Sequence, residues 1–303
     1  MTHLPTHHDI DDHDRGLAHD LQIISALASR RRALRWFASA GGIALLGGCD
    51  SGGSASTSTG SVSTPTPTPT ATATATPTPS PTTTGSCVAD PTETNGPYPA
   101  DGTNTSNGPT SNVLTTTGVV RSDIRSSFVG STTAVPGVQV TLTLTIVNVN
   151  ASCAALAGYA IYIWHCDALG RYSLYDVPAE SWLRGVGVTD ANGQVTFTTI
   201  FPGCYTGRWP HIHFEVFSSL SAATGGNFAR LISQLAMPAD TCATVYNGSS
   251  TYTSSVANLA RITVASDNVF GNNTAAQIAQ QTPTMSGSVA NGYTASAVIG
   301  LAI

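Results

Sequence analysis

The sequence predicts an all-β domain with long loops and little helix over residues 87–303. The composition favours strands, because Thr, Ser, Ala, Gly and Val are abundant, whereas Lys is absent and only 10% of the residues are charged. Several short runs alternate between apolar and polar residues, which is the period of a half-buried strand. Gly, Asn and Asp separate these runs at regular intervals and mark turns. Together these features predict a β-sandwich, with a barrel as the alternative.

The clearest strand is the run GVQVTLTLTIVNVN at residues 137–150. Its apolar residues alternate from Val138 to Ile146, and the alternation shifts at Val147, which predicts a bulge or an exit from the sheet. The best candidate for a helix is ARLISQLAM at 229–237. We therefore expect a sandwich of the immunoglobulin-like or prealbumin-like kind. The other expected strands lie within residues 159–168, 189–203, 207–217, 261–265 and 294–303.

Residues 1–49 are predicted to form an export signal rather than part of the fold. Residues 1–28 are polar and rich in His and Asp, so we expect a solvated leader, with a metal-binding tail as the alternative. Arginines at 30–32 then precede an apolar run that ends at Cys49. This run is shorter than the roughly 20 residues that span a bilayer. A positive segment followed by a short apolar one is typical of an export signal.

Two motifs sharpen this prediction. SRRRALR at 29–35 resembles a twin-arginine export signal, with Ala33 where an aromatic residue is usual. LGGC at 46–49 resembles a bacterial lipobox, in which Cys49 would be lipidated and become the first mature residue. An ordinary cleaved signal or a signal anchor is the alternative. The motifs predict an exported lipoprotein, held on the outer side of the cytoplasmic membrane, in the periplasm or at the cell surface.

Residues 50–86 consist mainly of Ser, Thr, Pro, Gly and Ala. Such a segment has too few apolar side chains to bury a core, and its prolines favour extended polyproline II structure. We expect a semi-rigid tether that holds the domain at 87–303 away from a membrane.

The charge pattern argues against a nucleic-acid partner. The formal net charge is −5, and every one of the 12 basic residues is Arg. Several of these arginines precede residue 36, so the remainder of the chain is mildly acidic. Binding to nucleic acid requires a basic face, which this composition does not provide.

The predicted export to an oxidising compartment makes disulfides plausible among the cysteines. Cys49 is assigned to the lipobox, and the remaining cysteines are widely spaced without a CxxC motif, which argues against a cysteine metal site. Their odd number predicts two disulfides and one free thiol, with a connectivity that spacing does not reveal. These cysteines are Cys87, Cys153, Cys166, Cys204 and Cys242.

The stretch GRWPHIHFEVF at 207–217 contains the feature that bears most directly on function. In a strand, His211 and His213 face the same side, and Ile212 faces the opposite layer. Two imidazoles on one face are able to bind one metal ion, although isolated pairs are often solvated or structural. Glu215 shares this face, and we expect it to be a bystander or an indirect partner rather than a ligand.

Two readings of the metal site follow from the other residues of the domain. A zinc site would combine His165 with His211 and His213. Tyr205 lies six residues before His211, and Tyr172 lies earlier, in DALGRYSLYD. Phenolates together with imidazoles suit a hard, high-valent ion such as Fe(III), which lowers the phenol pKa from its free value of about 10. The residues alone leave both readings open.

At this point the sequence resembles a known family. WHCDALGRYSLYD at 164–176 and WLRGVGVTDANGQVTFTTIFPGCYTGRWPHIHFEV at 182–216 resemble the intradiol ring-cleavage dioxygenases, which include catechol and protocatechuate 3,4-dioxygenases. The resemblance is densest over about residues 160–217, and it extends more loosely from CVADPTETNGPYPADG at 87–102 to the C-terminus. It implies a mononuclear non-haem Fe(III). The expected reaction cleaves a catechol with O2, between its two hydroxyl-bearing carbons, to a muconate-type diacid.

The resemblance also implies the metal ligands. Tyr172 corresponds to a tyrosinate that substrate displaces, and Tyr205 corresponds to a tyrosinate that stays bound. His211 and His213 correspond to the two histidine ligands. The two anionic oxygens, together with a bound hydroxide, would balance the charge of a ferric ion, and Tyr172 would take up a proton from the substrate.

Further residues are implied around the substrate. Arg208 corresponds to an arginine that lies over the substrate ring and stabilises developing negative charge. Gln234 resembles a glutamine that hydrogen-bonds near the site. Gly96, Pro97 and Tyr98, in TNGPYP, resemble a segment that lines the substrate pocket. The implied partners are a catechol and O2, and the resemblance leaves a homodimer open.

A binding module is the competing function. The same sandwich without its metal chemistry would serve as a surface adhesin or a carrier of aromatic ligands. The presence of both tyrosines and both histidines favours the enzyme, because the loss of any one of them would have favoured the module.

Overall fold

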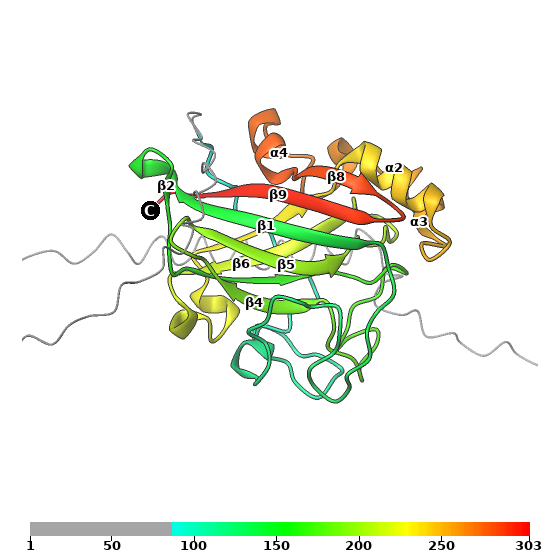
Figure 1. Ribbon diagram of the computed structural model, residues 1–303, viewed down its shortest axis with the longest axis horizontal. Helices are drawn as coiled ribbons and strands as arrows, with labels where there is room; N and C mark the ends of the chain where they lie inside the picture. The colour runs from blue at the N-terminus through cyan, green and yellow to red at the C-terminus, as the bar shows by residue number, and fades with distance from the viewer. Residues whose placement is uncertain (1–86) are drawn as a thin grey trace, which may run out of the picture. The chain divides into compact units, whose positions relative to one another are not determined.

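The structure is a computed structural model that describes residues 87–303, so the predicted export signal, Cys49 and the tether lie outside the described residues. The strands form two sheets (Figure 1). One has the order β2-β1-β9-β8, with β5 also paired to β1, and the other has the order β4-β3-β6-β7. This arrangement confirms the sandwich. The strands are β1 (Gln139–Asn148), β2 (Ala154–Ala155), β3 (Ala160–Trp164), β4 (Arg184–Val188), β5 (Gln194–Ile200), β6 (His211–Phe217), β7 (Leu231–Ala236), β8 (Thr284–Ser288) and β9 (Gly292–Leu301).

Helices are short and lie outside the two sheets (Figure 1). Within residues 87–303, none of them combines the length and the apolar character that crossing a membrane requires. The α-helices are α2 (Ala239–Gly248), α3 (Ser255–Leu259) and α4 (Ala275–Gln281), and the 3-10 helices are η2 (Val113–Thr115), η3 (Val149–Ala151), η4 (Leu220–Ala222), η5 (Gly226–Phe228) and η6 (Val264–Ser266).

The main core lies between the sheets. On β1, the alternating apolar residues from Val140 to Ile146 are buried, as the sequence pattern predicts. The alternation shifts at Val147, which is still paired in the sheet, and β1 ends one residue later at Asn148, close to the predicted exit. From the opposite sheet, Ile212 and Phe214 of β6 enter the same core. This burial determines which face of β6 remains for the histidines.

The outer face of the second sheet is covered by loops and short 3-10 helices. Tyr162 and Trp164 of β3 project from this face into a second buried cluster. Residues from the loop after β3, including Tyr172 and Tyr175, complete the cluster together with Val113. The candidate site therefore lies under irregular chain on the side of the sheet that faces away from the main core.

Two predictions of secondary structure were wrong. Residues 229–237 form no helix; their central part is β7, which pairs antiparallel with β6 and supplies hydrogen-bond partners along that strand. Residues 261–265 form no strand. Instead, a capping box between Thr263 and Ser266 favours the short helix η6.

The cysteine prediction was also wrong in number. Among the described residues there is one disulfide, between Cys87 and Cys153, which are 66 residues apart in sequence. Cys166, Cys204 and Cys242 are buried as free thiols. Burial raises the pKa of the Cys166 thiol well above its ordinary value, which keeps it protonated and unreactive.

Candidate metal centre

The two histidines are placed by the most regular part of the second sheet. β6 is paired on one side with β3 and on the other with β7, so its backbone is held by two ladders. His211 and His213 face the same side, as the strand period predicts, and both are buried. Their Nε2 atoms lie 3.1 Å apart. The sheet thus brings two imidazole nitrogens to one point.

The His211 ring is oriented by a hydrogen bond from the side away from the site. Its Nδ1 lies 2.5 Å from the carbonyl oxygen of Trp209. Because a carbonyl only accepts, Nδ1 carries the proton, and the lone pair of this neutral ring is left on Nε2. That tautomer is the one a metal ion requires.

The His213 ring is oriented by packing. Its ring stacks on Trp164, with centroids 4.7 Å apart and planes inclined by 8°. Gly96 lies against it as well, because a Cβ built on Gly96 would be 3.1 Å from His213 Cε1. Nδ1 of His213 is buried and has no hydrogen-bond partner among residues 87–303. Packing against Trp164 and Gly96, rather than a hydrogen bond to Nδ1, fixes the orientation of the His213 ring.

The two tyrosines come from loops. Tyr172 follows β3, and Tyr205 lies between β5 and β6. The loops approach each other at Gly170, whose φ is +83° and where a Cβ would lie 2.8 Å from Tyr205 Cβ. Any side chain at this position would push the loops apart. The backbone N–H of Tyr172 also donates to a carboxylate oxygen of Asp176 at 2.6 Å, which fixes the turn.

The four donor atoms converge. Tyr205 Oη lies 3.2 Å and Tyr172 Oη 3.4 Å from His211 Nε2, and the two phenol oxygens are 3.5 Å apart. Donors that share one first-row metal ion lie roughly 3 to 3.5 Å from each other, given bonds of about 2 Å. Two phenol oxygens and two neutral imidazoles also form a donor set that suits a ferric ion. The residues therefore fit the metal that the resemblance implies.

The pKa values of the donors describe how the site is protonated when no metal ion is bound. Burial, with Arg208 nearby, lowers the pKa of His211 to about 3, and burial and His211 lower the pKa of His213 well below its usual range. Burial and the neighbouring Tyr205 raise the pKa of Tyr172 well above 10. Without a cation, the imidazoles are neutral and the Tyr172 phenol keeps its proton. A bound high-valent ion would provide the positive charge that a phenolate requires.

Arg208 lies in the loop that precedes β6 and is buried beside the donors. Its Nε donates to Asp267 Oδ2 at 3.0 Å, and its Nη2 donates to Gln234 Oε1 at 2.7 Å. Burial alone would lower the pKa of Arg208, but Tyr205 and Asp267 raise it above its ordinary value. Arg208 in turn holds the pKa of Asp267 low. Both groups of this buried pair are charged, so Arg208 presents a permanent cation at the site.

Gln234 reaches the site from β7. It is the cross-strand partner of His213, and besides accepting from Arg208 it donates through Nε2 to the carbonyl oxygen of Thr94 at 3.0 Å. The expected hydrogen bonding of Gln234 near the site is therefore present in the structure. Thr94 opens the segment that continues to Gly96, so one amide side chain joins that segment to the arginine.

The predicted pocket segment lies next to Tyr172. The ring centroid of Tyr98 is 4.9 Å from that of Tyr172 and 5.1 Å from that of Tyr175. Asn104 donates to the carbonyl oxygen of Pro97. Gly96 has a φ of +69°, and this left-handed conformation brings the chain against His213 without a clash. The structure brings the segment to the site, and its contact with substrate stays a prediction.

The alternative zinc triad does not form. His165 is buried, but its Nδ1 lies 2.8 Å from the carbonyl oxygen of Cys166, and its Nε2 lies 2.7 Å from Thr199 Oγ1. Both nitrogens are therefore occupied, one by the chain just after β3 and the other by β5 of the first sheet. Across residues 87–303, no three or more His, Cys, Asp and Glu side chains gather where they would hold a metal ion. A donor set at this site therefore has to include the tyrosines.

Glu215 continues the histidine face of β6 but points into a separate buried environment. Both of its carboxyl oxygens lack a hydrogen-bond partner among the described residues. Burial, with Asp101 close by, raises its pKa well above the ordinary value, so it is a neutral acid. It is not among the converging donors, as expected.

Sequence reasoning missed two residues that shape the site. Trp164 carries the His213 ring, and Asp267 binds Arg208 across 59 residues of sequence. Trp164 was within an expected strand, and its cross-strand pairing with His213 follows only once the register is known. Asp267 stands in an irregular segment, SDN, with no pattern that would single it out.

Comparison with known proteins agrees with this arrangement. Residues 127–271 match the model of a family described as Dioxygenase. The β chain of a protocatechuate 3,4-dioxygenase from Burkholderia cepacia is 33% identical over 93 residues, which cover 26% of this chain and only 37% of that relative. An intradiol ring-cleavage dioxygenase from Tetranychus urticae has the same fold, with a TM-score of 0.54 and 24% identity over 71% of this chain and 95% of that one. The first two matches show similarity to dioxygenases over part of the chain, and the third shows a shared fold.

Proposed function

We propose that the chain is an exported intradiol dioxygenase that uses a mononuclear Fe(III) to cleave a catechol between its hydroxyl-bearing carbons, yielding a muconate-type diacid. The observation that carries the proposal is the convergence of two phenol oxygens and two imidazole nitrogens: His211 Nε2 lies 3.1–3.4 Å from each of the other three atoms, and the two phenol oxygens are 3.5 Å apart. The family match over residues 127–271 includes all four of these residues. Tyr172, Tyr205, His211 and His213 would hold the metal.

Bound Fe(III) would supply a Lewis acid and a template that prepares a chelated catecholate for O2. The chain supplies the proton acceptor, because Tyr172 Oη stands at the junction of the donors and the Tyr98 segment, where a substrate hydroxyl would lose its proton. Tyr205, anchored between β5 and β6, would stay in place.

Arg208 would stabilise negative charge that develops on the substrate oxygens. Its guanidinium is already oriented by Asp267 and Gln234 before substrate binds, so little reorganisation is required at the moment of reaction. The buried Trp164 and the segment from Gly96 to Tyr98 would limit the access of water to the ring.

The location of the enzyme is part of the proposal. The twin-arginine-like motif and the lipobox-like motif at Cys49 support export and a lipid anchor, with residues 50–86 as a tether. A catechol met outside the cytoplasm would then be the substrate. To test the anchor, the chain would be labelled with a radioactive fatty acid. The label should be present in the wild type and absent from Cys49→Ala.

Spectroscopy and oxygen uptake test the activity. The full chain, purified with stoichiometric iron, is expected to be wine-red from tyrosinate-to-iron charge transfer and to consume O2 with catechol, protocatechuate or hydroxyquinol. Under labelled O2, both oxygen atoms should appear in the diacid. A colourless protein fully occupied by zinc would contradict the metal, and a red protein that consumes no O2 with any of these catechols would instead favour a binding module.

A further inference from the structure

Asp267 lies in the irregular segment between α3 and α4, and its carboxylate is buried and fully used. Oδ2 accepts from Arg208 Nε at 3.0 Å and from the backbone N–H of Trp209 at 2.7 Å. Oδ1 accepts from the backbone N–H groups of Val269 at 2.9 Å and Phe270 at 3.1 Å. Each oxygen thus accepts two hydrogen bonds, and those to Oδ1 come from the segment that carries Asp267 itself. The carboxylate is therefore held in one position.

The first consequence concerns the arginine. Asp267 fixes Arg208 through Nε, while Gln234 fixes it through Nη2. Two acceptors on different edges of a planar guanidinium set both its position and the orientation of its plane. Gln234 is itself held by the carbonyl oxygen of Thr94 at 3.0 Å. The arginine is therefore clamped between two elements, the α3–α4 segment and β7.

The second consequence concerns the first histidine. The same Oδ2 that binds Arg208 also binds the N–H of Trp209, and the carbonyl oxygen of Trp209 receives the Nδ1 proton of His211. One carboxylate oxygen of Asp267 thus binds both Arg208 and Trp209. Arg208 is the cation, and the Trp209 carbonyl fixes the tautomer of His211. An uncharged acceptor of the same size would offer one oxygen instead of two.

We propose that Asp267 is a positioning residue for the ring-cleavage reaction, which acts by holding Arg208 in register with the metal-binding face of β6. This inference rests on the proposed function. Its chemistry is that of a fixed carboxylate that never touches the substrate, and it predicts that Asp267 influences turnover through Arg208.

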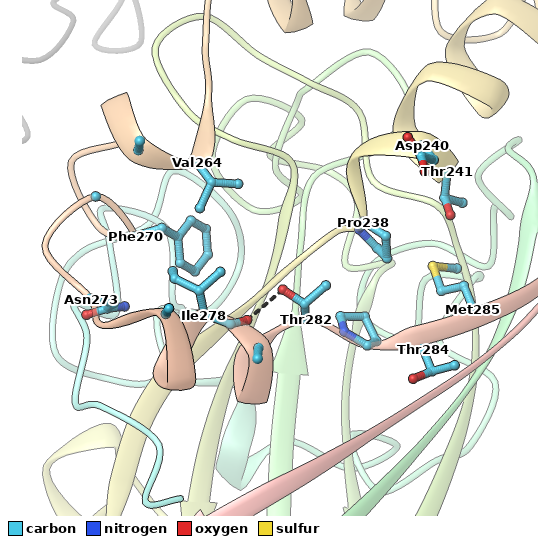
Figure 2. Close-up of a pocket in the computed structure, with 15 residues that line it drawn as sticks. Pro238, Asp240, Thr241, Val264, Phe270, Asn273, Ile278, Thr282, Thr284 and Met285 are labelled. Carbon is cyan, nitrogen blue, oxygen red and sulfur yellow. Dashed lines mark hydrogen bonds between the residues drawn. The ribbon is translucent and has the colours of Figure 1, made fainter.

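A purely structural role is the alternative to be separated. Buried ion pairs are on average weak sources of stability, because desolvation offsets much of their attraction. The segment that carries Asp267 also packs on its other side, where Val264 and Phe270 line a cavity of about 940 Å³ together with Pro238, Ile278 and Met285 (Figure 2). Val264→Ala therefore loosens the same segment without touching the carboxylate, and it serves as the matched control.

The experiment is a double-mutant cycle on the full, iron-loaded chain, with Asp267→Asn, Arg208→Gln, the double variant and Val264→Ala. We expect Asp267→Asn to lower kcat about 10- to 100-fold, the range for a small misplacement of a reacting group, with a smaller change in KM. In the Arg208→Gln background, Asp267→Asn should lower kcat by no more than about twofold, because the group through which it acts is gone. Val264→Ala should retain wild-type kcat.

Two measurements do not depend on turnover. Anaerobic titration with catechol, followed in the visible spectrum, should show iron and substrate bound in Asp267→Asn. Thermal unfolding of the iron-free chains should show that the double variant is more stable than Asp267→Asn alone, because Arg208 no longer leaves a buried unpaired charge. That double variant keeps the test valid if Asp267→Asn folds poorly.

Multiplicative losses of kcat in the double variant, or an equal loss in Val264→Ala, would overturn the inference while the proposed function stands. A wild-type chain that binds iron but consumes no O2 would overturn both. Loss of iron from Asp267→Asn in parallel with its loss of kcat would also overturn the inference, because the carboxylate would then act on the metal site rather than through the arginine.

Discussion

The two halves of the candidate metal centre are built in different ways. The histidines lie on β6, in the interior of a sheet, and their spacing follows from the strand itself. The tyrosines lie on loops that meet where Gly170 permits close approach to Tyr205 and where the backbone N–H of Gly203 donates to the carbonyl oxygen of Asp167. The difference teaches that the sheet supplies a rigid pair of donors, whereas the loops supply donors whose position depends on a few tertiary contacts.

This division matches the proposed chemistry. A ligand that leaves the metal when substrate binds needs room to move, and a loop grants that more readily than a central strand. Tyr172, the proposed displaceable ligand, is on a loop, where its backbone N–H donates to Asp176 and its carbonyl oxygen accepts from the backbone N–H groups of Asp176 and Val177. The histidines, which are proposed to stay bound to the metal, lie on a central strand with less freedom to move.

The largest effect is expected from breaking the rigid half. His213→Ala removes a donor that no neighbouring side chain is able to replace, so iron affinity should fall more than about 100-fold, beyond the loss typical of outer residues. Iron content after dialysis and the visible absorbance measure it. His165→Asn is the control, since His165 binds Cys166 and Thr199 instead, and it should keep the iron. Retention of colour in His213→Ala would contradict the assigned ligand set.

Substitutions of the two loop tyrosines should have different effects on iron binding and activity. Tyr205→Phe should lose most of the red colour and nearly all activity, because the retained phenolate is gone. Tyr172→Phe should keep iron and part of the colour but lose about 100- to 10,000-fold in kcat, the range for losing an acid–base group. Absorbance spectra and oxygen uptake on the same samples check this. Equal effects of the two substitutions would show that the loops do not divide these roles.

The pH dependence of stability tests whether His165, which follows β3, is buried as a neutral imidazole. Burial lowers the pKa of His165 to about 4 from an ordinary 6.5. The unfolded chain therefore takes up a proton that the folded chain refuses, and stability is lost as the pH falls from about 6.5 to about 4. Relative to His165→Asn, the free energy of unfolding of the iron-free wild type should fall by about 3 kcal/mol over this window. Chemical denaturation at several pH values measures it, and a constant difference would contradict the prediction.

The smallest effect compares two glycines. Gly96 and Gly207 both have left-handed φ values, +69° and +83°, but an added Cβ meets His213 only at Gly96 and meets nothing within 4 Å at Gly207. Gly207→Ala should cost about 1 kcal/mol of unfolding free energy, and Gly96→Ala about 1–3 kcal/mol with a lower iron affinity. Denaturation curves and iron content decide this. Equal costs would show that Gly96 does not brace the histidine.

The regular half of the site was predictable from sequence, and the irregular half was predictable only in part. Strand period places His211 and His213 on one face without further information, and the buried alternation of β1 predicts the sandwich. The tyrosines entered through a resemblance, because their meeting depends on loop conformation. Residues 229–237 were predicted as a helix, since a short apolar run fits either structure and pairing with β6 decides between them.

Long-range partners were beyond sequence reasoning. Asp267 is separated from Arg208 by 59 residues, and no local pattern distinguishes it from a surface acid. Trp164 became a support for His213 only through the register of β3 against β6. Such contacts are set by the packing of whole elements, so they appear only when the fold is known.

The disulfide between Cys87 and Cys153 has a mechanical consequence. Any tension that arrives along the chain before residue 87 passes through the sulfur bridge to the turn between β1 and β2, rather than along the intervening 66 residues. The bypassed stretch includes Gly96 and Tyr98, which brace His213 and Tyr172. If the domain is pulled from its N-terminal side, the force would therefore act on the sandwich. The segment that packs against the proposed metal ligands would carry little of it.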